Sequence, residues 1–275
     1  MIKQWRLDTN NQSLVLSSSG NRLPCVIYWG KSLPSHESPD EMIEASKKDW
    51  GDNLIDLVPE LSILPEQSAN FSGQLGSKMR DINGQLLSSS FVFHSDKVSA
   101  NSLTLIYKDK ELGLTYTAKI DSMEEHDVFA LEAKIESKNP IIMEWLSAPV
   151  IEASQNSNEI VGYGGHWGGE FRRQTTPWVT GTHLRESRVG TTSHAHFPGL
   201  LIPASGSSEN SGSCYGFHYG WSGGHRMVAE QLQDGRKQIQ FGHTENSELS
   251  PGKSFETAKL YITHSGDGAG GVGRT

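Results

Sequence analysis

The sequence has few cysteines, a low hydrophobic content and no excess of basic charge. Its 275 residues include two cysteines, Cys25 and Cys214, and 35% hydrophobic residues. Because free cysteine packs as a small hydrophobic residue, we expect two buried thiols rather than a disulfide. The low hydrophobic content argues against a parallel sheet buried on both faces, and it suits antiparallel sheets with one face toward water.

The charge balance and the lack of long apolar runs exclude two classes of partner. The formal net charge is -8, and the lysines and arginines form no cluster. A nucleic-acid partner is therefore not expected, because neutralising phosphates requires a concentrated basic surface. No run reaches the apolar length of a membrane helix, and residues 1–13 lack the apolar core of a signal peptide. These features predict a cytoplasmic protein without membrane contact.

Several motifs that carry chemistry are missing. The sequence has no GxSxG elbow, no P-loop, no dinucleotide-binding glycine pattern after a strand and no zinc spacing. His194 and His196 would share one face of a strand, where two imidazoles could bind a metal. No acidic residue or cysteine with suitable spacing completes that set, so hydrogen-bonded histidines are favoured. We expect neither a metal nor another cofactor.

Runs of alternating apolar and polar residues dominate the chain. This period of two is typical of half-buried strands. Turn sequences such as Gly20-Asn21 and Asp234-Gly235 separate the runs, and the strands recur in the rhythm of a sandwich or barrel. The predicted strands cover residues 13–19, 24–30, 90–95, 102–109, 112–121, 127–137, 236–243 and 254–263.

Two segments depart from this pattern. Residues 38–50 begin with a serine, a proline and acidic residues, which predicts one short helix or helical loop. This helix lies in a long stretch, residues 32–76, that has weak strand signals; such stretches are often functional or interfacial. The glycine-rich residues 266–275 read as a tail or linker.

Charged residues in the second half of the chain suggest structural roles. Glu170 is close to Arg172 and Arg173, which would keep its carboxyl ionised and make it a poor general acid. We interpret Glu170 as structural. Glu186 and Arg188 share a strand face, and we interpret them as an ion pair on a sheet.

An aromatic row allows two interpretations. Phe217, Tyr219 and Trp221 alternate along a predicted strand and would share one face. Rows of this kind stack on sugar rings in carbohydrate-binding sandwiches, and they also fill hydrophobic cores. Burial statistics favour the core, and sugar stacking stays as the alternative.

Four stretches of the chain resemble the N-terminal domain of the α-galactosidases of glycoside hydrolase family 36, the melibiase type. ESRVGTTSHAHFPG resembles the most specific motif of that family, and the order and spacing of all four match. The stretches are HWGGEFRR (residues 166–173), ESRVGTTSHAHFPG (186–199), CYGFHYGWSGGH (214–225) and ELSPGKSFETAKLYITHSGDG (248–268).

The resemblance implies a fold for this chain and a separate catalytic domain. It implies an all-β, two-sheet antiparallel β-supersandwich of the galactose mutarotase-like kind over residues 1–265, with at most one or two short helices. Residues 266–275 would lead to a catalytic (β/α)8 barrel that carries the two catalytic aspartates. Neither aspartate segment occurs in this chain, so we expect no catalytic residue and no activity from it alone. The glycine-rich residues 162–174 would then serve conformation and packing.

The resemblance also implies partners. Bacterial members of the family are often tetramers, in which a loop of one N-terminal domain reaches the active site of a neighbour and contacts sugar. By position, that loop falls in residues 38–56, with Asp49 and Trp50 as candidate substrate contacts. The expected partners are the chain's own catalytic barrel, further copies of the chain and a galactoside.

Three hypotheses follow. The first is a non-catalytic N-terminal domain of an α-galactosidase that hydrolyses terminal α-galactosides, such as melibiose and raffinose, with retention. The second is an enzyme like aldose 1-epimerase, in which His194 or His196 works with Glu170 or Glu186 on a sugar ring. The third is a sugar-binding module whose stacking platform is the aromatic row described above.

Overall fold

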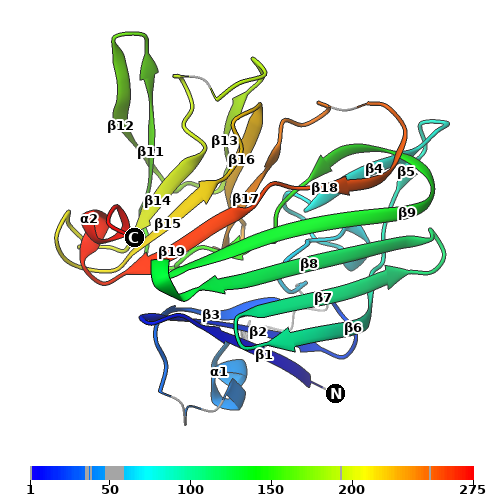
Figure 1. Ribbon diagram of the computed structural model, residues 1–275, viewed down its shortest axis with the longest axis horizontal. Helices are drawn as coiled ribbons and strands as arrows, with labels where there is room; N and C mark the ends of the chain where they lie inside the picture. Colours follow the sequence, from blue (N-terminus) through cyan, green and yellow to red (C-terminus); the bar gives the residue numbers. More distant parts are fainter. Residues whose placement is uncertain (1, 35–36, 38, 47–58, 193, 248) are drawn as a thin grey trace.

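The protein is built almost entirely from antiparallel β-strands. The computed structural model describes residues 2–34, 37, 39–46, 59–192, 194–247 and 249–275. Within these residues the strands form three hydrogen-bonded sheets, accompanied by two short α-helices (Figure 1). The all-β, antiparallel sandwich predicted from the alternating sequence pattern is confirmed.

The largest sheet has 12 strands and extends across the whole molecule (Figure 1). Its main path runs through β12 (Gly169–Pro177), β11 (Glu159–His166), β14 (Gly199–Pro203), β15 (Cys214–Tyr219), β19 (Leu260–Ser265), β9 (Val128–Leu146), β8 (Leu114–Met123), β7 (Ser102–Asp109) and β6 (Val92–Ser99). Off this path, β18 (Gly252–Glu256) and β4 (Ser77–Asp81) pair with β9, and β5 (Leu86–Leu87) pairs with β4.

Two smaller sheets pack on the large one. The first contains β1 (Ile2–Asp8), β2 (Gln12–Ser19) and β3 (Cys25–Lys31). The second contains, in spatial order, β10 (Ile151–Glu152), β17 (Lys237–His243), β16 (His225–Gln231) and β13 (Gly181–Ser187). Strand β1 contacts β7, β3 contacts β19, and β17 contacts β9. The layer that covers the large sheet is therefore divided into two hydrogen-bonded units.

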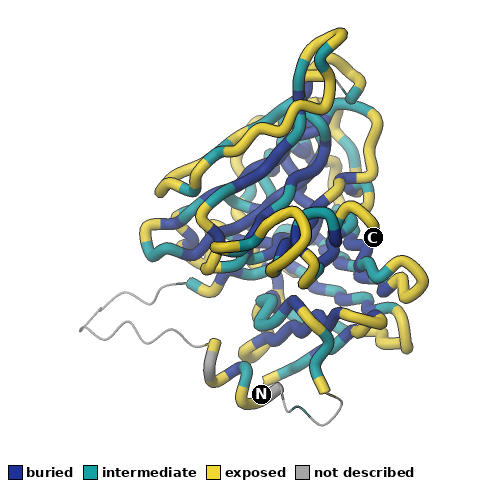
Figure 2. Tube along the Cα trace, turned by 90° about the vertical axis from the view of Figure 1, so that its left-hand side faces the viewer, coloured by how far each residue is buried: buried dark blue, intermediate teal, exposed yellow. Residues whose placement is uncertain are grey.

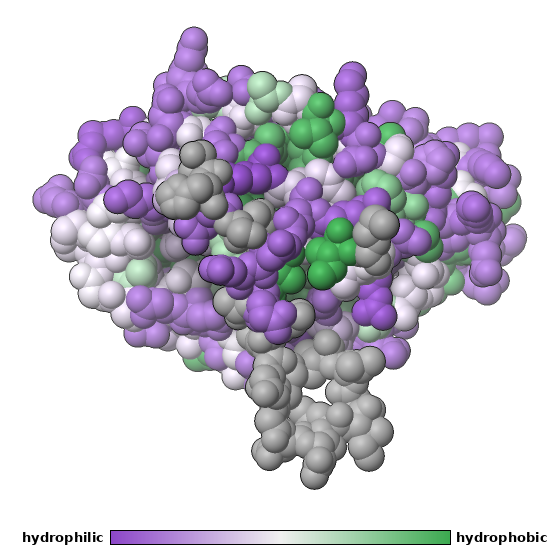
Figure 3. Space-filling view, turned by 90° about the horizontal axis from the view of Figure 1, so that it is seen from below, coloured by the Kyte–Doolittle hydropathy of each residue, from purple (hydrophilic) through white to green (hydrophobic). Residues whose placement is uncertain are grey.

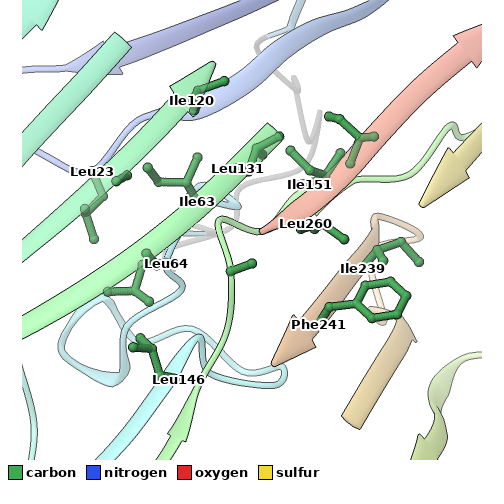
Figure 4. Close-up of a cluster of buried hydrophobic side chains, with 14 of the residues drawn as sticks. Leu23, Ile63, Leu64, Ile120, Leu131, Leu146, Ile151, Ile239, Phe241 and Leu260 are labelled. Atoms are coloured by element: carbon green, nitrogen blue, oxygen red, sulfur yellow. The ribbon is translucent and has the colours of Figure 1, made fainter. Parts of the chain in front are cut away.

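One continuous hydrophobic core joins the three sheets. On β9, Leu131 faces the core, and it pairs with Ile120 of β8 and Leu260 of β19. Ile239 and Phe241 of β17 extend the same cluster from the second small sheet (Figure 4). Burying each such side chain contributes about 1.5–3 kcal/mol, so the core is the main source of stability. The buried trace runs through the middle of the molecule, and exposed residues concentrate in loops and hairpin ends (Figure 2).

The outer surface is largely polar where Figure 3 shows it. On this face hydrophilic residues predominate, and hydrophobic residues show only in small separated patches (Figure 3). None of the described helices is both long enough and apolar enough to cross a bilayer.

The two segments without strand periodicity form helices. The helix expected over residues 38–50 is present as α1 (Pro39–Ser46), and residues 47–50 lie outside the described residues. Residues 266–275, expected as a tail or linker, contain α2 (Gly268–Val272), a helix that was not predicted. The helix packs on β15 and β19, and a Cβ at Gly216 of β15 would collide with the side chain of Val272. The glycines allow this close packing, which composition alone did not predict.

Both cysteines are free thiols, as predicted. Cys214 is buried and Cys25 is half-buried. Burial raises the pKa of the Cys214 thiol to about 11, so it is inert at neutral pH.

Candidate functional site

The hairpin of β11 and β12 projects from one end of the large sheet (Figure 1). Its tip turns at Gly168, whose φ of +74° favours glycine. Strand β12 is the end strand of the large sheet, and most of its residues are exposed. The segment that carries the glycines of HWGGEFRR is therefore a protruding element rather than a core strand.

A bulge interrupts the hairpin and changes where its side chains point. The register shifts between Gly164 and His166, so that Glu170 and Phe171 on β12 fall in the irregular part of the ladder. Phe171 has a φ of +53°, a left-handed conformation that is rare for a bulky residue. Such strain costs on the order of 1–3 kcal/mol and occurs preferentially at functional sites. Bulges also re-aim side chains near such sites.

The loop that follows β13 closes over the hairpin and is fixed by hydrogen bonds at several points. Phe197 donates its backbone N–H to the Tyr163 carbonyl at 3.1 Å. Thr192 donates its backbone N–H to the Ser222 carbonyl at 2.7 Å. Gly164 leaves space for this approach, because a Cβ there would collide with the Ala195 carbonyl oxygen.

The hairpin and the loop together form a hollow of about 160 Å³ that is open to solvent on one side. Three of its lining residues have polar side chains: Glu170, Thr192 and His194. The remaining lining residues are Gly164, Phe171 and Phe197.

Aromatic rings surround the hollow in a continuous series. The Phe171 ring lies 6.2 Å from Tyr163 and 5.0 Å from Phe197, measured between ring centroids. At the rim, Trp167 is 84% exposed and contacts the His194 ring edge to face at 6.0 Å. Phe171 is itself 65% exposed. Large exposed rings beside convergent polar groups are typical of a binding site.

Glu170 is held as a carboxylate. Hydrogen bonds from its own backbone N–H and from Gly168, the latter at 2.9 Å, lower its pKa below the usual range. The nearby imidazoles of His194 and His166 act in the same direction. Its Oε1 lies 4.0 Å from Nδ1 of His194. The prediction that Glu170 stays ionised agrees with its lowered pKa. Backbone amides, rather than the two neighbouring arginines, are the main cause of this lowering.

The ion pair predicted from the alternation of residues 186 and 188 is present. Arg188 Nε donates to Glu186 Oε2 at 2.7 Å, and the same arginine donates to the Glu245 carbonyl at 3.2 Å. Glu186 is thus occupied in holding the base of the loop.

The aromatic row does not form one exposed platform. Phe217 is 4% exposed and Tyr219 is fully buried, and both belong to the hydrophobic core. Trp221 is 45% exposed, but it lies beyond the end of β15 and its ring rests against His243 at 4.6 Å. The core interpretation is correct for the first two residues, because alternation along β15 points both of them inward.

Asp49 and Trp50, the candidate substrate contacts, lie outside the described residues. Among the described residues, no group of three His, Cys, Asp or Glu side chains is placed to hold a metal ion. His194 and His196 therefore acquire no third ligand in this part of the chain.

Sequence reasoning missed Phe171, Thr192 and Phe197 as lining residues. Strict alternation would put Phe171 and Glu170 on opposite faces of β12, and only the bulge brings both to the hollow. The one available signal was the concentration of glycines in residues 162–169, which marks close backbone approach.

Comparison with known proteins agrees with the resemblance seen in the four motifs. The model of the glycosyl hydrolase family 36 N-terminal domain matches residues 22–249. The chain is 28% identical to an α-galactosidase of Escherichia coli over 98% of its own length and 38% of that protein. It is also 28% identical to α-galactosidase AgaA of Geobacillus stearothermophilus, over 99% of its length and 41% of the relative.

A solved structure shares the fold. The crystal structure of a Geobacillus stearothermophilus AgaA variant in complex with raffinose superposes with a TM-score of 0.83 at 21% identity. The match covers 97% of this chain and 41% of that one. The chain thus spans about two fifths of the length of the relatives it matches. Since the family model covers most of the sequence, the chain belongs to the glycosyl hydrolase family 36 N-terminal domain family.

Proposed function

We propose that this chain is the non-catalytic N-terminal domain of an α-galactosidase that hydrolyses terminal α-galactosides of the melibiose and raffinose type with retention. The observation that carries the proposal is the extent of the match. The α-galactosidase of Escherichia coli aligns with 98% of this chain, yet 62% of that relative lies outside the alignment, since only 38% of it is covered. The domain would support the catalytic barrel and the assembly of the oligomer.

The hollow supports a non-catalytic role. A retaining glycosidase needs two carboxyl groups about 5 Å apart, one of them an acid with a raised pKa. Among the lining residues of the described hollow, Glu170 is the single carboxylate, and its pKa is lowered. A carboxylate of this kind accepts hydrogen bonds but is a poor proton donor at neutral pH.

Three finer features belong to the same proposal. The enzyme forms a homo-oligomer, and Asp49 and Trp50 of one subunit contact the galactoside bound by a neighbour. The protein works in the cytoplasm, which suits its two free cysteines, Cys25 and Cys214. Replacing Trp50 by alanine in the oligomeric enzyme is expected to raise KM for raffinose while subunit assembly, measured by light scattering, is unchanged.

The experiment has two arms. The purified chain is first assayed with 4-nitrophenyl α-D-galactopyranoside, and no hydrolysis above background is expected. The chain then replaces the matching N-terminal part of AgaA in a chimera, which is expected to hydrolyse the same substrate. NMR of the first-formed galactose is expected to show the α-anomer, as retention requires. Turnover by the isolated chain at the rate of an ordinary glycosidase would overturn the proposal.

One observation favours a second function, that of an aldose 1-epimerase. Glu170 and His194 lie 4.0 Å apart in the hollow, and a carboxylate base with an imidazole acid is the pair such a reaction uses. Polarimetry of freshly dissolved α-D-galactose tests this function directly. Accelerated mutarotation that disappears in His194→Ala would favour the epimerase, whereas a rate equal to the buffer rate would remove it.

A further inference from the structure

The hollow beside the β11–β12 hairpin has the composition of a carbohydrate site. We propose that it binds one hexopyranosyl unit of a neutral oligosaccharide, with Trp167 and Phe171 as stacking surfaces and Glu170 as the main hydrogen-bond acceptor. This inference rests on the proposed function for the choice of sugar. It concerns a site within this domain, formed by residues other than Asp49 and Trp50.

The polar groups match a hydroxyl-bearing ligand. The distance of 4.0 Å between Glu170 Oε1 and His194 Nδ1 exceeds that of a direct hydrogen bond, so a hydroxyl between them can donate to the carboxylate and accept from the imidazole. The Thr192 hydroxyl donates to the Trp221 carbonyl at 3.3 Å, which leaves its lone pairs free to accept. Three polar groups thus converge on one small volume.

The electrostatics of the site favour a neutral ligand. The Glu170 carboxylate repels an anion. The guanidinium of Arg172 folds over Gly169, next to Glu170 in the chain, so a cation is not favoured either. A polyhydroxylated ring satisfies the carboxylate without adding charge.

The size and the aromatic rim set the mode of binding. A hollow of about 160 Å³ is smaller than ordinary ligand pockets, so it accommodates one edge of a single ring. The exposed face of Trp167 lies beside this opening, since its ring contacts His194 of the lining. An apolar face of the sugar can stack there, as aromatic rings offer a large surface with little loss of conformational freedom.

The strained backbone fits the same role. Phe171 keeps a φ of +53° although nothing in the hairpin turn requires it, because the turn itself is made at Gly168. The left-handed residue lies within the bulge that brings Glu170 and Phe171 to the hollow together.

The test is a titration of the ¹⁵N-labelled chain with raffinose, followed by NMR. We expect the Trp167 indole and the amides of Gly164 and Gly169 to shift together, with a Kd on the order of millimolar. Trp167→Ala and Glu170→Gln are each expected to weaken binding about tenfold. The control is Glu136→Gln, which replaces an exposed carboxylate on β9 away from the hollow and should bind as the unaltered chain does.

Three results would overturn the inference. The first is that the hairpin signals do not shift at about 50 mM raffinose, well above the expected Kd. The second is that Trp167→Ala shows the same chemical-shift changes as the unaltered chain. The third is that only the catalytic part of AgaA shifts these signals, which would make the hairpin a protein-docking surface. The chimera assay separates this inference from the proposed function. An active chimera whose hairpin does not bind raffinose contradicts the sugar site alone. An inactive chimera whose hairpin binds raffinose contradicts the proposed function alone.

Discussion

Glu66 offers a direct test of how burial controls stability in this fold. Its Oε1 accepts hydrogen bonds from the Ser89 hydroxyl at 2.9 Å and from the Phe91 backbone N–H at 3.1 Å. Desolvation by burial nevertheless raises its pKa from 4.5 to about 7, and the two hydrogen bonds only partly oppose this rise. Asp109 nearby acts in the same direction as burial.

The raised pKa fixes the sign of the pH dependence. Between pH 4.5 and about 7 the folded protein holds a proton on Glu66 that the unfolded chain has released. The contribution of this proton to stability is complete below pH 4.5 and is lost as the pH rises through 7. A tenfold change in proton affinity corresponds to about 1.4 kcal/mol, so ionising Glu66 in the folded state costs about 3 kcal/mol at pH 8.

Glu66→Gln keeps the accepting oxygen and removes the ionisation. We measure the free energy of unfolding of both proteins by urea titration at several pH values. The difference in this free energy, variant minus unaltered protein, is expected to rise by about 3 kcal/mol from pH 4.5 to pH 8. Taking the difference cancels the other titrating groups, since those are common to both proteins. Glu136→Gln, at an exposed carboxylate paired with Lys134, is the control and should leave the difference near zero. Parallel curves for Glu66→Gln and the unaltered protein would refute the reasoning.

Three further predictions concern packing and the hairpin. Leu131→Ala opens a cavity in the continuous core and is expected to lower the free energy of unfolding by about 2–5 kcal/mol, whereas Leu249→Ala, at an exposed position, should change it by less than about 0.5 kcal/mol; equal losses in urea unfolding would contradict the assigned core. Tyr219→Phe removes the hydroxyl that accepts from the Ala258 N–H at 3.0 Å, and calorimetry should show a loss of about 1–3 kcal/mol; an unchanged Tm would mean that the amide finds another acceptor. Gly164→Ala places a methyl group against the Ala195 carbonyl and should disorder the loop without unfolding the sheets, seen as loss of amide protection at Phe197 alone; protection lost throughout the chain would show that the loop is part of the core.

The alternating segments were predictable because a period of two is set by the backbone itself. Ile120 and Leu131, which lie in the predicted strands 112–121 and 127–137, face each other in the core. The division of the covering layer into two sheets was not predictable, since it depends on which strands pair. Pairing between strands distant in sequence, such as β19 with β9, leaves no local signal.

The candidate site was only partly predictable for the same reason. His194 and Glu170 stood out as residue types that carry chemistry, but their closeness arises from a loop folding back on a hairpin. The φ of Phe171 has no sequence signature, because left-handed residues are normally glycine or asparagine. The helix in residues 266–275 was missed because its glycines suggest flexibility, while in the structure Gly268 and Gly271 are buried and Gly216 of β15 leaves room for Val272.

The pairing of strand β9 indicates where the chain can be opened for circular permutation. It pairs with β8 through Ser137 and begins its ladder with β4 at Ile141. Pro140, which cannot donate to a ladder, therefore lies between the two ladders. A circular permutant opened at residues 138–140 leaves the ladders with β8 and β4 intact, interrupts the β18 ladder only at its register shift, and should fold. A permutant opened at Ala133 would instead sever the backbone inside the ladder with β8.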